Sequence, residues 1–408
     1  MNTTFIHINK TNFFTIPKEI NLKNIDFLVL KSIKSSKIWI SKVYHNRYNN
    51  KIWISNKIKK REKFKILKKI NLNKSKKINE NIISIRIKDK IILFNPPKGS
   101  FYLIKEKIKL DKNLAWLIGF YLAEGNRKNK DGIGLSNKEI ILLNKSMALF
   151  EKIFGINQSD WRIWIKTNQK NPKEIKRIKE KWNKKLGRNI SIAYSKLAFE
   201  ESIDIRINSR VLSSFLKYYF EYSLKKMIID KNLAKQFLRG YVIGDGSVIL
   251  RKKQIHGITI TVKDKKHIEY LIKTFTLLYN QKPNIRKTKS SYELSYCKVD
   301  IITKIIMDGL FKDLNRQWNK LIKGYKNKQY TRARIKYWNK ITNKYLNSYE
   351  IAKLSGNSHW AVSDALNKDE KKGLVNSQYL SNGGPIKKYY SLSPKGLQLF
   401  DTIGGRIK

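Results

Sequence analysis

Two acidic residues, each followed directly by glycine, end two similar apolar segments of this chain. Glu124-Gly125 closes the first segment and Asp245-Gly246 closes the second. Small residues recur four positions apart before each acid: Ala115, Gly119 and Ala123 in the first copy, Gly240 and Gly244 in the second. Residues i and i+4 share a helix face, so such a stripe lets two helix backbones approach closely. Its repetition at matching positions indicates a duplicated functional helix.

The position of the two acids points to a divalent cation. A helix C-terminus carries partial negative charge, which disfavours a carboxylate there. Packing the two helices side by side would bring Glu124 and Asp245 together and add to the repulsion. Carboxylates, backbone carbonyls and water are the hard oxygen ligands that suit Mg²⁺. We also expect Gly125 and Gly246 to leave their helices with positive φ.

The elements around these helices repeat as well. Asp111-Lys112-Asn113-Leu114-Ala115 recurs letter for letter at 230–234 and leads into each apolar helix. A strand-to-helix passage follows at 133–139 and at 258–264, and a second such passage begins at 203–207 and at 292–296. Two tandem copies of one α/β unit, over 105–224 and 225–328, are the economical interpretation.

The two ends of the chain have a different character. Residues 1–104 form a basic region in which Lys37–Ser41 recurs as Lys51–Ser55 around a polar stretch, which predicts a β-hairpin. Pro96–Gly99 marks its boundary. It is interpreted as a possible DNA-contacting domain.

The tail, 340–408, predicts a separate small domain. Ser348 is expected to cap a helix over Tyr349–Ser355, and Ser358 a second one to about Lys372. A two-stranded ribbon and a last helix from Pro394 would follow, which is the order of a winged helix-turn-helix.

Composition narrows the classes of function. The chain has 87 Lys+Arg against 31 Asp+Glu, a net charge of +56, and a phosphate backbone is the obvious partner. An AT-rich coding sequence also favours Lys, Asn and Ile, but it does not explain so few acids. One cysteine, Cys297, excludes an internal disulfide or a cysteine zinc site within one chain. No apolar run approaches the ~18 residues of a membrane span, and no secretory signal is visible.

The paired segments, over roughly 105–325, resemble the LAGLIDADG homing endonucleases, particularly the two-motif, single-chain type also found inside inteins. The resemblance implies an α+β fold: two tandem αββαββα units forming a pseudo-twofold saddle astride the DNA major groove. The basic N-terminal region and the winged helix would be additions to it. Gly119 and Gly240 would pack the central helices. Glu124 and Asp245 match the catalytic acids, and would bind Mg²⁺ with the carbonyls of Ala123 and Gly244. Mn²⁺ is expected to substitute for Mg²⁺.

The sequence departs from the family pattern in two ways. Glu124 stands where the family name has Asp, and Gly119 and Gly240 occupy its earlier acid position. The family also places a basic residue near each acid. The candidates are Arg206 in copy one and Lys298 or Lys287 in copy two, with Lys128 and Lys252 as rivals.

Other basic and aromatic residues are expected to contact DNA. In the repeated units these are Lys128, Lys138, Lys252, Lys263, Lys287 and Lys289. In the tail, His359 and Trp360 would lie on the helix that enters the major groove, and Lys387 and Lys388 on the wing would meet phosphates. Acids on the same helix, Asp364, Asp369 and Glu370, favour the alternative of a protein-docking domain.

Three functions remain open at this stage. The first is a site-specific endonuclease that makes Mg²⁺-dependent double-strand breaks at a long pseudo-symmetric DNA site. The second is an intron maturase that binds structured host-intron RNA, and the third is a nuclease-inactive DNA-binding regulator. Retention of both acids disfavours the third. Intein splicing residues are absent from the ends, so a free-standing monomer is expected. It would be intracellular, in the cytoplasm or nucleoid or in an organelle with an AT-rich genome.

Overall fold

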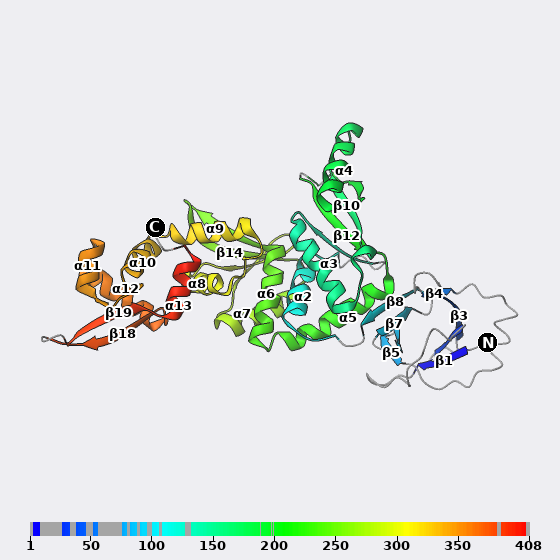
Figure 1. The fold of residues 1–408 in the computed structure, drawn as a ribbon, viewed down its shortest axis with the longest axis horizontal. Coiled ribbons are helices and arrows are strands. Elements are labelled where there is room, and N and C mark those ends of the chain that lie inside the picture. Colours follow the sequence, from blue (N-terminus) through cyan, green and yellow to red (C-terminus); the bar gives the residue numbers. More distant parts are fainter. Residues whose placement is uncertain are drawn as a thin grey trace. The chain divides into compact units, whose positions relative to one another are not determined.

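The computed structural model describes residues 3–8, 27–32, 38–45, 52–55, 76–79, 82–87, 90–95, 100–105, 108–126, 132–187, 189–196, 198, 200–381 and 385–404. The chain divides into two compact units, Met1–Phe237 and Leu238–Lys408 (Figure 1). The division falls later than the boundary at 224 that the repeat predicts. The second unit contains the tail as well as most of the second copy.

Two four-stranded sheets form the N-terminal region. The first contains β1 (Thr3–Ile8), β2 (Phe27–Ser32), β3 (Ile38–His45) and β4 (Ile52–Ser55), in that order, with β1 parallel to β2. The second is an antiparallel meander of β5 (Lys76–Asn79), β6 (Ile82–Ile87), β7 (Lys90–Asn95) and β8 (Ser100–Lys105). Strands β3 and β4 pair antiparallel, with Tyr44 opposite Trp53, so the predicted hairpin is confirmed. The predicted boundary at Pro96–Gly99 lies outside the described residues.

The first copy is α2 (Lys112–Glu124), β9 (Ile133–Asn137), α3 (Ile140–Phe154), a 3₁₀ turn η2 (Gln158–Asp160), β10 (Arg162–Thr167), α4 (Pro172–Leu186), β11 (Ser191–Tyr194), β12 (Ser202–Ile207) and α5 (Arg210–Met227). The second copy is α6 (Lys231–Asp245), β13 (Gly246–Arg251), β14 (Gln254–Val262), α7 (Lys265–Tyr279), β15 (Asn284–Lys287), β16 (Tyr292–Tyr296) and α8 (Val299–Asp308). The predicted strands at 203–207 and 292–296 are confirmed.

The two sheets share one strand order. The second copy has the order β13-β14-β16-β15 and the element order αββαββα that was expected. The first has β11-β10-β12-β9, in which β9, β12 and β10 correspond to β14, β16 and β15. Among the described residues it departs from the expected order once, because α4 and β11 are inserted between β10 and β12. At the position where β13 begins in the second copy, Gly125 makes a bridge with Leu135, and residues 127–131 lie outside the described residues.

The repeated pentapeptide is a helix-start signal. The side chain of Asp111 accepts a hydrogen bond from the backbone N–H of Leu114 at 2.9 Å. Asp230 accepts from the N–H groups of Asn232 and Leu233, at 2.8 and 3.0 Å. Aspartate is among the preferred N-cap residues because its carboxylate satisfies donors that the first turn leaves unbonded.

Alternation along the strands separates an apolar face from a polar one. In β10 and β12, Ile163, Ile165, Ile203 and Ile205 are buried. The intervening residues face the other side of the sheet. Helix α2 is buried from Leu114 to Leu122 on all sides, as expected of an internal helix.

The remaining elements complete the second unit. They are α9 (Asn315–Lys326), α10 (Gln329–Lys340), β17 (Leu346–Asn347), α11 (Ser348–Ser355), α12 (His359–Lys371), β18 (Val375–Leu380), β19 (Lys387–Leu392) and α13 (Pro394–Thr402). Helix α9 packs on the β13–β14 hairpin, where a Cβ on Gly324 would lie 2.4 Å from Leu250 Cδ2. Gln317 on α9 accepts a hydrogen bond from Val248 N at 3.1 Å, which satisfies a donor of the edge strand β13.

The elements predicted for the tail are present in the predicted order. Ser358 caps α12, as expected. The cap of α11 is Asn347 and not Ser348, because Asn347 forms a capping box with Glu350. An additional strand, β17, pairs with β19.

A buried ion pair fastens α12 to α10. Arg334 Nε donates to both carboxylate oxygens of Asp369 at 2.7 Å, and Trp338 Nε1 donates to Oδ2 at 3.0 Å. Arg334 and Asp369 are 3% and 1% exposed. Burial raises the pKa of Asp369, although Arg334 and Trp338 act in the opposite direction. Asp369, one of the acids that favoured a protein-docking tail, is therefore a structural residue.

Removing one partner of this pair should cost far more than replacing both. Asp369→Ala should lower the free energy of local unfolding by about 3–5 kcal/mol, since it leaves the Arg334 charge buried and uncompensated. The double variant Arg334→Met/Asp369→Leu should recover most of that loss. Hydrogen exchange of α12 amides measures both. A cost below about 1 kcal/mol for the single variant would contradict this role.

Candidate active site and nucleic-acid interface

Both acid–glycine helix ends have the same local geometry. Glu124 and Asp245 are the last residues of α2 and α6, and both are half-buried. Gly125 is extended, with φ −72° and ψ 139°, and Gly246 is not among the positive-φ glycines. The expectation of positive φ was therefore wrong. The glycines are needed for space, because a Cβ at Gly125 would lie 2.3 Å from Tyr121 O.

In the second copy, the distance from an added Cβ to the carbonyl oxygen four residues earlier is the same. A Cβ at Gly246 would lie 2.3 Å from Val242 O and 2.8 Å from Val242 Cγ1. In each copy the chain passes from the helix directly into extended backbone, and the carbonyl four residues earlier occupies the place of the side chain. The acid is thus held at the point where helix becomes strand.

The electrostatics of these two ends differ from those of most other helices. Neither α2 nor α6 has a basic residue in its last turn, although lysine is abundant in the chain. Helices α3, α4, α5, α9, α10, α11 and α12 each carry lysine there. The negative end of each dipole is therefore reinforced by an acid and not compensated by a lysine in the same turn.

Asn137 orients the acid of the first copy. Its Nδ2 donates to Glu124 Oε1 at 2.7 Å, and its Oδ1 accepts from Glu139 N at 2.8 Å. The bridge Gly125–Leu135 corresponds to the pair Gly246–Ile260, so Val262 occupies the position equivalent to Asn137. The two acids are therefore supported differently. Asn137 was not predicted as a site residue, although its contrast with Val262 in the aligned strands indicates it.

A buried carboxylate lies on the polar face of the first sheet. Asp204 is 2% exposed, accepts from Ser136 Oγ at 2.8 Å and pairs with Arg206 Nη2 at 2.6 Å and Lys166 Nζ at 3.2 Å. The side chains of Arg206 and Lys166 remain 34% and 29% exposed. This cluster presents two partly exposed cations around one buried anion. Asp204 was not singled out from the sequence, because its burial depends on strand pairing.

The predicted basic partners of the acids are placed as follows. Arg206 is held by Asp204. Lys298 is the exposed N-cap of α8. Lys252 has φ 47° in the β13–β14 turn, at the opposite end of β13 from Asp245, roughly 20 Å along a strand. Lys128 lies outside the described residues.

The second sheet has a polar face rich in hydroxyl groups. Thr259 pairs with Ser295, and Thr261 with Glu293, which in turn pairs with Arg286. Lys287 pairs with Tyr292, in the row of Val262, and thus belongs to the other face of the sheet. Arg286 was not singled out from the sequence, although strand alternation relative to Thr261 indicates it.

The other predicted DNA contacts are mostly exposed. Lys263, Lys287 and Lys289 are exposed, and Lys138 forms an ion pair with Glu200. In the tail, Trp360 is 82% exposed, His359 stacks on Tyr349 with ring centroids 3.8 Å apart, and Lys387 is exposed.

Lys388 is tied to the acids of α12. Its Nζ donates to Glu370 Oε2 at 2.6 Å and Asn367 Oδ1 at 3.1 Å. The hydrogen bond from Lys388 is the main reason why the pKa of Glu370 is lowered. This pair therefore stabilises the fold above the ordinary glutamate pKa, and its contribution is lost as pH falls through the lowered value. Asp364 likewise pairs with Lys368 at 2.7 Å. Asp364 and Glu370 are thus engaged within the tail, and Asp369 is engaged by Arg334 of α10.

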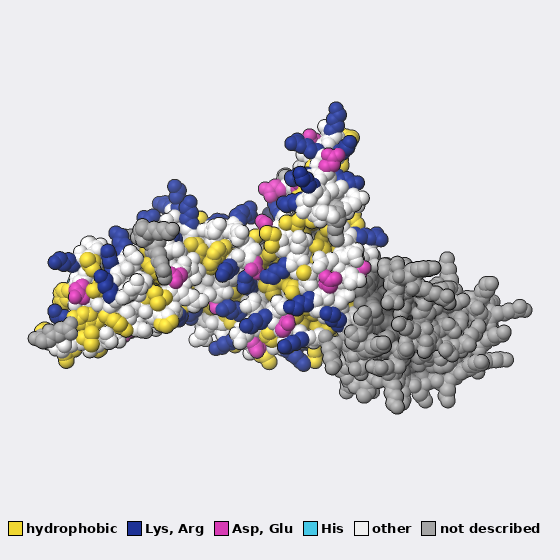
Figure 2. Space-filling model, in the orientation of Figure 1, with side chains coloured by type: hydrophobic (Ala, Val, Ile, Leu, Met, Phe, Trp, Pro, Cys, Tyr) yellow, Lys and Arg dark blue, Asp and Glu magenta, His cyan; other side chains and the backbone are white. Residues whose placement is uncertain are grey.

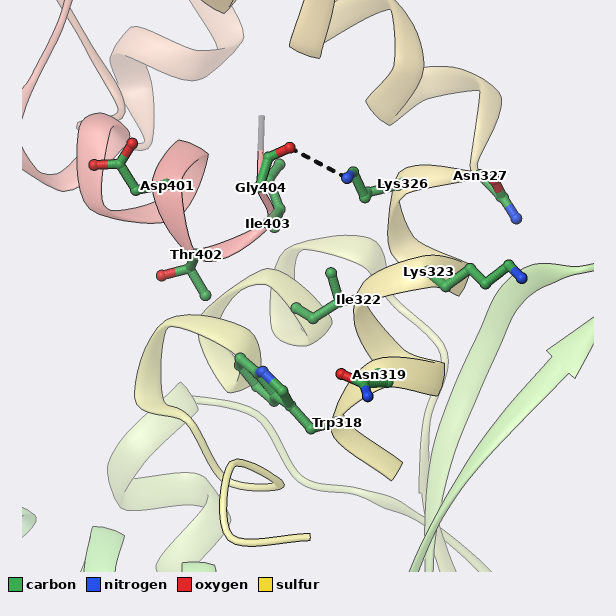
Figure 3. Close-up of a pocket in the computed structure, with 10 residues that line it drawn as sticks. All are labelled: Trp318, Asn319, Ile322, Lys323, Lys326, Asn327, Asp401, Thr402, Ile403 and Gly404. Atoms are coloured by element: carbon green, nitrogen blue, oxygen red, sulfur yellow. Dashed lines mark hydrogen bonds between the residues drawn. The ribbon is translucent and has the colours of Figure 1, made fainter. Parts of the chain in front are cut away.

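Hollows are present among the described residues of the second unit. One, of about 620 Å³, lies between α9 and the end of α13, where Lys326 Nζ donates to Gly404 O at 3.2 Å (Figure 3). The other, of about 350 Å³, lies beside the Arg334–Asp369 pair. None of the site residues predicted from the sequence lines either one. Within the described ranges, no three His, Cys, Asp or Glu side chains gather as a metal cluster.

Comparison with known proteins finds a family match within the second copy. Residues 232–310 match the family model of the LAGLIDADG-like domain, which supports the family resemblance predicted from the sequence of this segment. A stretch of 204 residues is 28% identical to the DNA-directed RNA polymerase subunit Rpo1C of Methanocaldococcus jannaschii. That match covers 48% of this chain and 19% of the subunit, so the chain spans about a fifth of that relative.

Solved structures with similarity have low TM-scores. Full-length DUF199/WhiA from Thermatoga maritima is 14% identical, with 65% of this chain and 92% of that one covered and a TM-score of 0.32. The homing endonuclease I-WcaI bound to its DNA recognition sequence is 15% identical, with 53% of this chain and 88% of that one covered and a TM-score of 0.31. The homing endonuclease I-SmaMI bound to cleaved DNA is 15% identical, with 64% of this chain and 99% of that one covered and a TM-score of 0.30. Values this low carry no information about activity. No helix in the described part of the chain is long and apolar enough to cross a bilayer.

The glycines after the acids should tolerate no side chain. Gly125→Ala and Gly246→Ala should each lower the free energy of local unfolding of their helix ends by about 1–3 kcal/mol, because Cβ meets a backbone oxygen. Gly373→Ala is the control, because nothing lies within 4 Å of a Cβ at this position. Its only destabilisation comes from the positive φ of +66°. Hydrogen exchange at the ends of α2 and α6 measures the effect. Both site variants matching wild type would contradict the steric role.

The Asp204 cluster should depend on its anion. Asp204→Asn should cost about 1–3 kcal/mol, since two cations lose a charged acceptor, and their partial exposure moderates the loss. Ser136→Ala removes one neutral donor and should cost about 1 kcal/mol or less. Hydrogen exchange of β12 amides compares the two variants. An Asp204→Asn cost no larger than that of Ser136→Ala would show that the ion pairs contribute nothing.

Proposed function

We propose that this protein is a site-specific DNA endonuclease that makes metal-dependent double-strand breaks at a long, pseudo-symmetric duplex site. One observation carries the proposal: the chain builds the same acid-ended helix twice, with the same glycine exit and no basic residue in the last turn. An arrangement that concentrates negative charge at two helix ends is unfavourable without a cation. The match of the second copy to the LAGLIDADG-like domain supports this interpretation.

The donor atoms at the helix ends fit Mg²⁺. The carboxylates of Glu124 and Asp245, with the carbonyls of Ala123 and Gly244, are all hard oxygen ligands, which Mg²⁺ and Mn²⁺ prefer. In this proposal the two repeated copies would form a pseudo-twofold saddle, in which Gly119 and Gly240, both buried, would let α2 and α6 approach. Bound metal would activate water and stabilise the leaving 3′ oxygen. Asn137 would hold the Glu124 carboxylate in its binding orientation.

The polar faces of the two sheets would contact the duplex. The first presents Arg206 and Lys166 around Asp204, and the second presents Thr261, Ser295 and Arg286. Guanidinium and hydroxyl groups read base edges in the major groove, whereas lysines supply phosphate contacts. Arg206 and Lys298 are the proposed basic groups near the acids.

The tail would be a winged helix-turn-helix that reads a second DNA segment. Trp360 is largely exposed at the start of α12, and Lys387 is exposed on the ribbon, where it would meet phosphate. Lys388 would instead hold the ribbon against α12 through Glu370. The acids of α12 do not oppose this role, because lysine or arginine partners engage Asp364, Asp369 and Glu370.

The acids should separate cutting from binding. Glu124→Gln and Asp245→Asn should each reduce cleavage by at least about a hundredfold, since each removes a charged metal ligand, while duplex affinity stays within about threefold of wild type. The measurement is linearisation of supercoiled plasmids carrying a library of candidate sites, with Mg²⁺ or Mn²⁺. Chelation of the metal should stop the reaction.

Asp264→Asn is the matched control. Asp264 caps α7 and accepts from Lys266 N, so its replacement changes a carboxylate away from both helix ends. It should cut at nearly the wild-type rate. Tight binding without cutting under either metal would indicate a nuclease-inactive regulator. Preference for structured host-intron RNA over every duplex would indicate a maturase.

A further inference from the structure

The first copy contains an insertion that the second copy lacks. Residues 168–201, here called the basic arm, connect β10 to β12 and include α4 and β11. The equivalent strands of the second copy, β15 and β16, are joined by only four residues, 288–291. The arm is therefore not needed to form the sheet. Its presence in one copy calls for a separate explanation.

The described residues of the arm extend the first sheet. Strand β11 adds to the edge of that sheet, parallel to β10. Asn171 caps α4, Pro172 occupies its first turn, and Trp182 Nε1 donates to Glu201. Only Ile178 and Trp182 of this helix are buried. Figure 1 shows α4 standing beyond β10 and β12 within the first unit.

Positive charge covers the outer surface of the arm. Its 34 residues include ten basic and four acidic side chains, and all seven basic residues of α4 are exposed. At 3.6 residues per turn, Lys173, Arg177 and Lys184 lie on the face opposite Ile178 and Trp182. Figure 2 shows dark-blue side chains along this projection, with magenta ones among them. Of the arm's acids, Glu201 is engaged with Lys181 at the base of the helix.

This charge density is unfavourable in the protein alone. Seven cations lie along a 15-residue helix of roughly 22 Å, so neighbours are closer than the Debye length of about 8 Å at physiological salt. Helix stability does not require them, because two buried residues and an N-cap fix the helix. A duplex offers a phosphate charge about every 1.7 Å along its axis, which complements a rod of cations of this length.

We propose that the basic arm is a phosphate-contacting extension that lies along duplex DNA beyond the sequence read by the sheets. The inference rests on the proposed function as a DNA-binding protein, and adds a distinct surface to it. The arm supplies affinity and length of contact, and it reads no bases. Its removal should therefore weaken binding to all duplex sequences alike.

The test replaces four outward cations: Lys173→Gln, Lys176→Gln, Arg177→Gln and Lys184→Gln. The control removes the same charge from α7 and α8, by Lys265→Gln, Lys266→Gln, Lys273→Gln and Lys304→Gln, all exposed positions. Fluorescence anisotropy measures affinity for a labelled duplex of random sequence over a salt series. The arm variant should bind about ten- to a hundredfold more weakly. Its log–log salt slope should be shallower by about 3–4, whereas the control should change little.

A second variant removes the arm entirely. Residues 168–201 are replaced by Thr288-Lys289-Ser290-Ser291, the turn that joins the equivalent strands of the second copy. It should show the same shallower slope, and the advantage of longer duplexes over shorter ones should diminish. Equal losses of duplex affinity in the arm and control variants would overturn the proposed role of the arm. That role would also be overturned if the arm variants lost affinity for structured RNA while their duplex binding stayed unchanged. A wild-type protein that does not bind duplex DNA would overturn the proposed function as well.

Discussion

The carbonyl oxygens of Tyr121 and Val242 fix how the two motif helices end. Each lies where the residue after the acid would carry its Cβ, so only glycine can follow, and the chain turns at once from helix to extended backbone. Glu124 and Asp245 are thereby placed at the junction between helix and extended backbone. No lysine in either last turn compensates their charge, although the chain carries a net +56. In the proposed function, a carboxylate at the negative end of a helix is suited to a divalent cation.

Around this shared junction the two copies have diverged. In the first, Asn137 donates to the acid, and Asp204 organises Arg206 and Lys166 on the polar face. In the second, Val262 replaces the donor, and hydroxyl groups cover much of the polar face. The first sheet gains the basic arm, whereas the second is covered by α9 on its hairpin. A duplicated core with unequal surroundings is suited to a partner whose two halves are similar but not identical.

Local signals in the sequence predicted most of the elements. Repeated pentapeptides, strand alternation and the Ser358 cap each act within a few residues, and the structure has a helix or strand at each. Two features were missed because they depend on contacts between residues far apart in the sequence. Asn137 reaches Glu124 only through the pairing of Gly125 with Leu135, and Asp204 is buried by neighbouring strands. The glycine exits were predicted as left-handed because Gly after a helix commonly is, whereas here a close carbonyl is decisive. Asn347 and not Ser348 caps α11, because only Asn347 lies three residues before Glu350. The Glu350 side chain can therefore accept a hydrogen bond from the backbone N–H of the cap.

In the proposed function, the two acids, one from each copy, meet at bound metal. A crystal structure of the protein with duplex DNA and Mn²⁺, with anomalous differences used to locate the ion, tests this most directly. The proposal predicts anomalous peaks at roughly 2.1 Å from carboxylate oxygens of Glu124 and Asp245, beside a backbone phosphate. Carboxylates far apart, with no anomalous density at either, would contradict it.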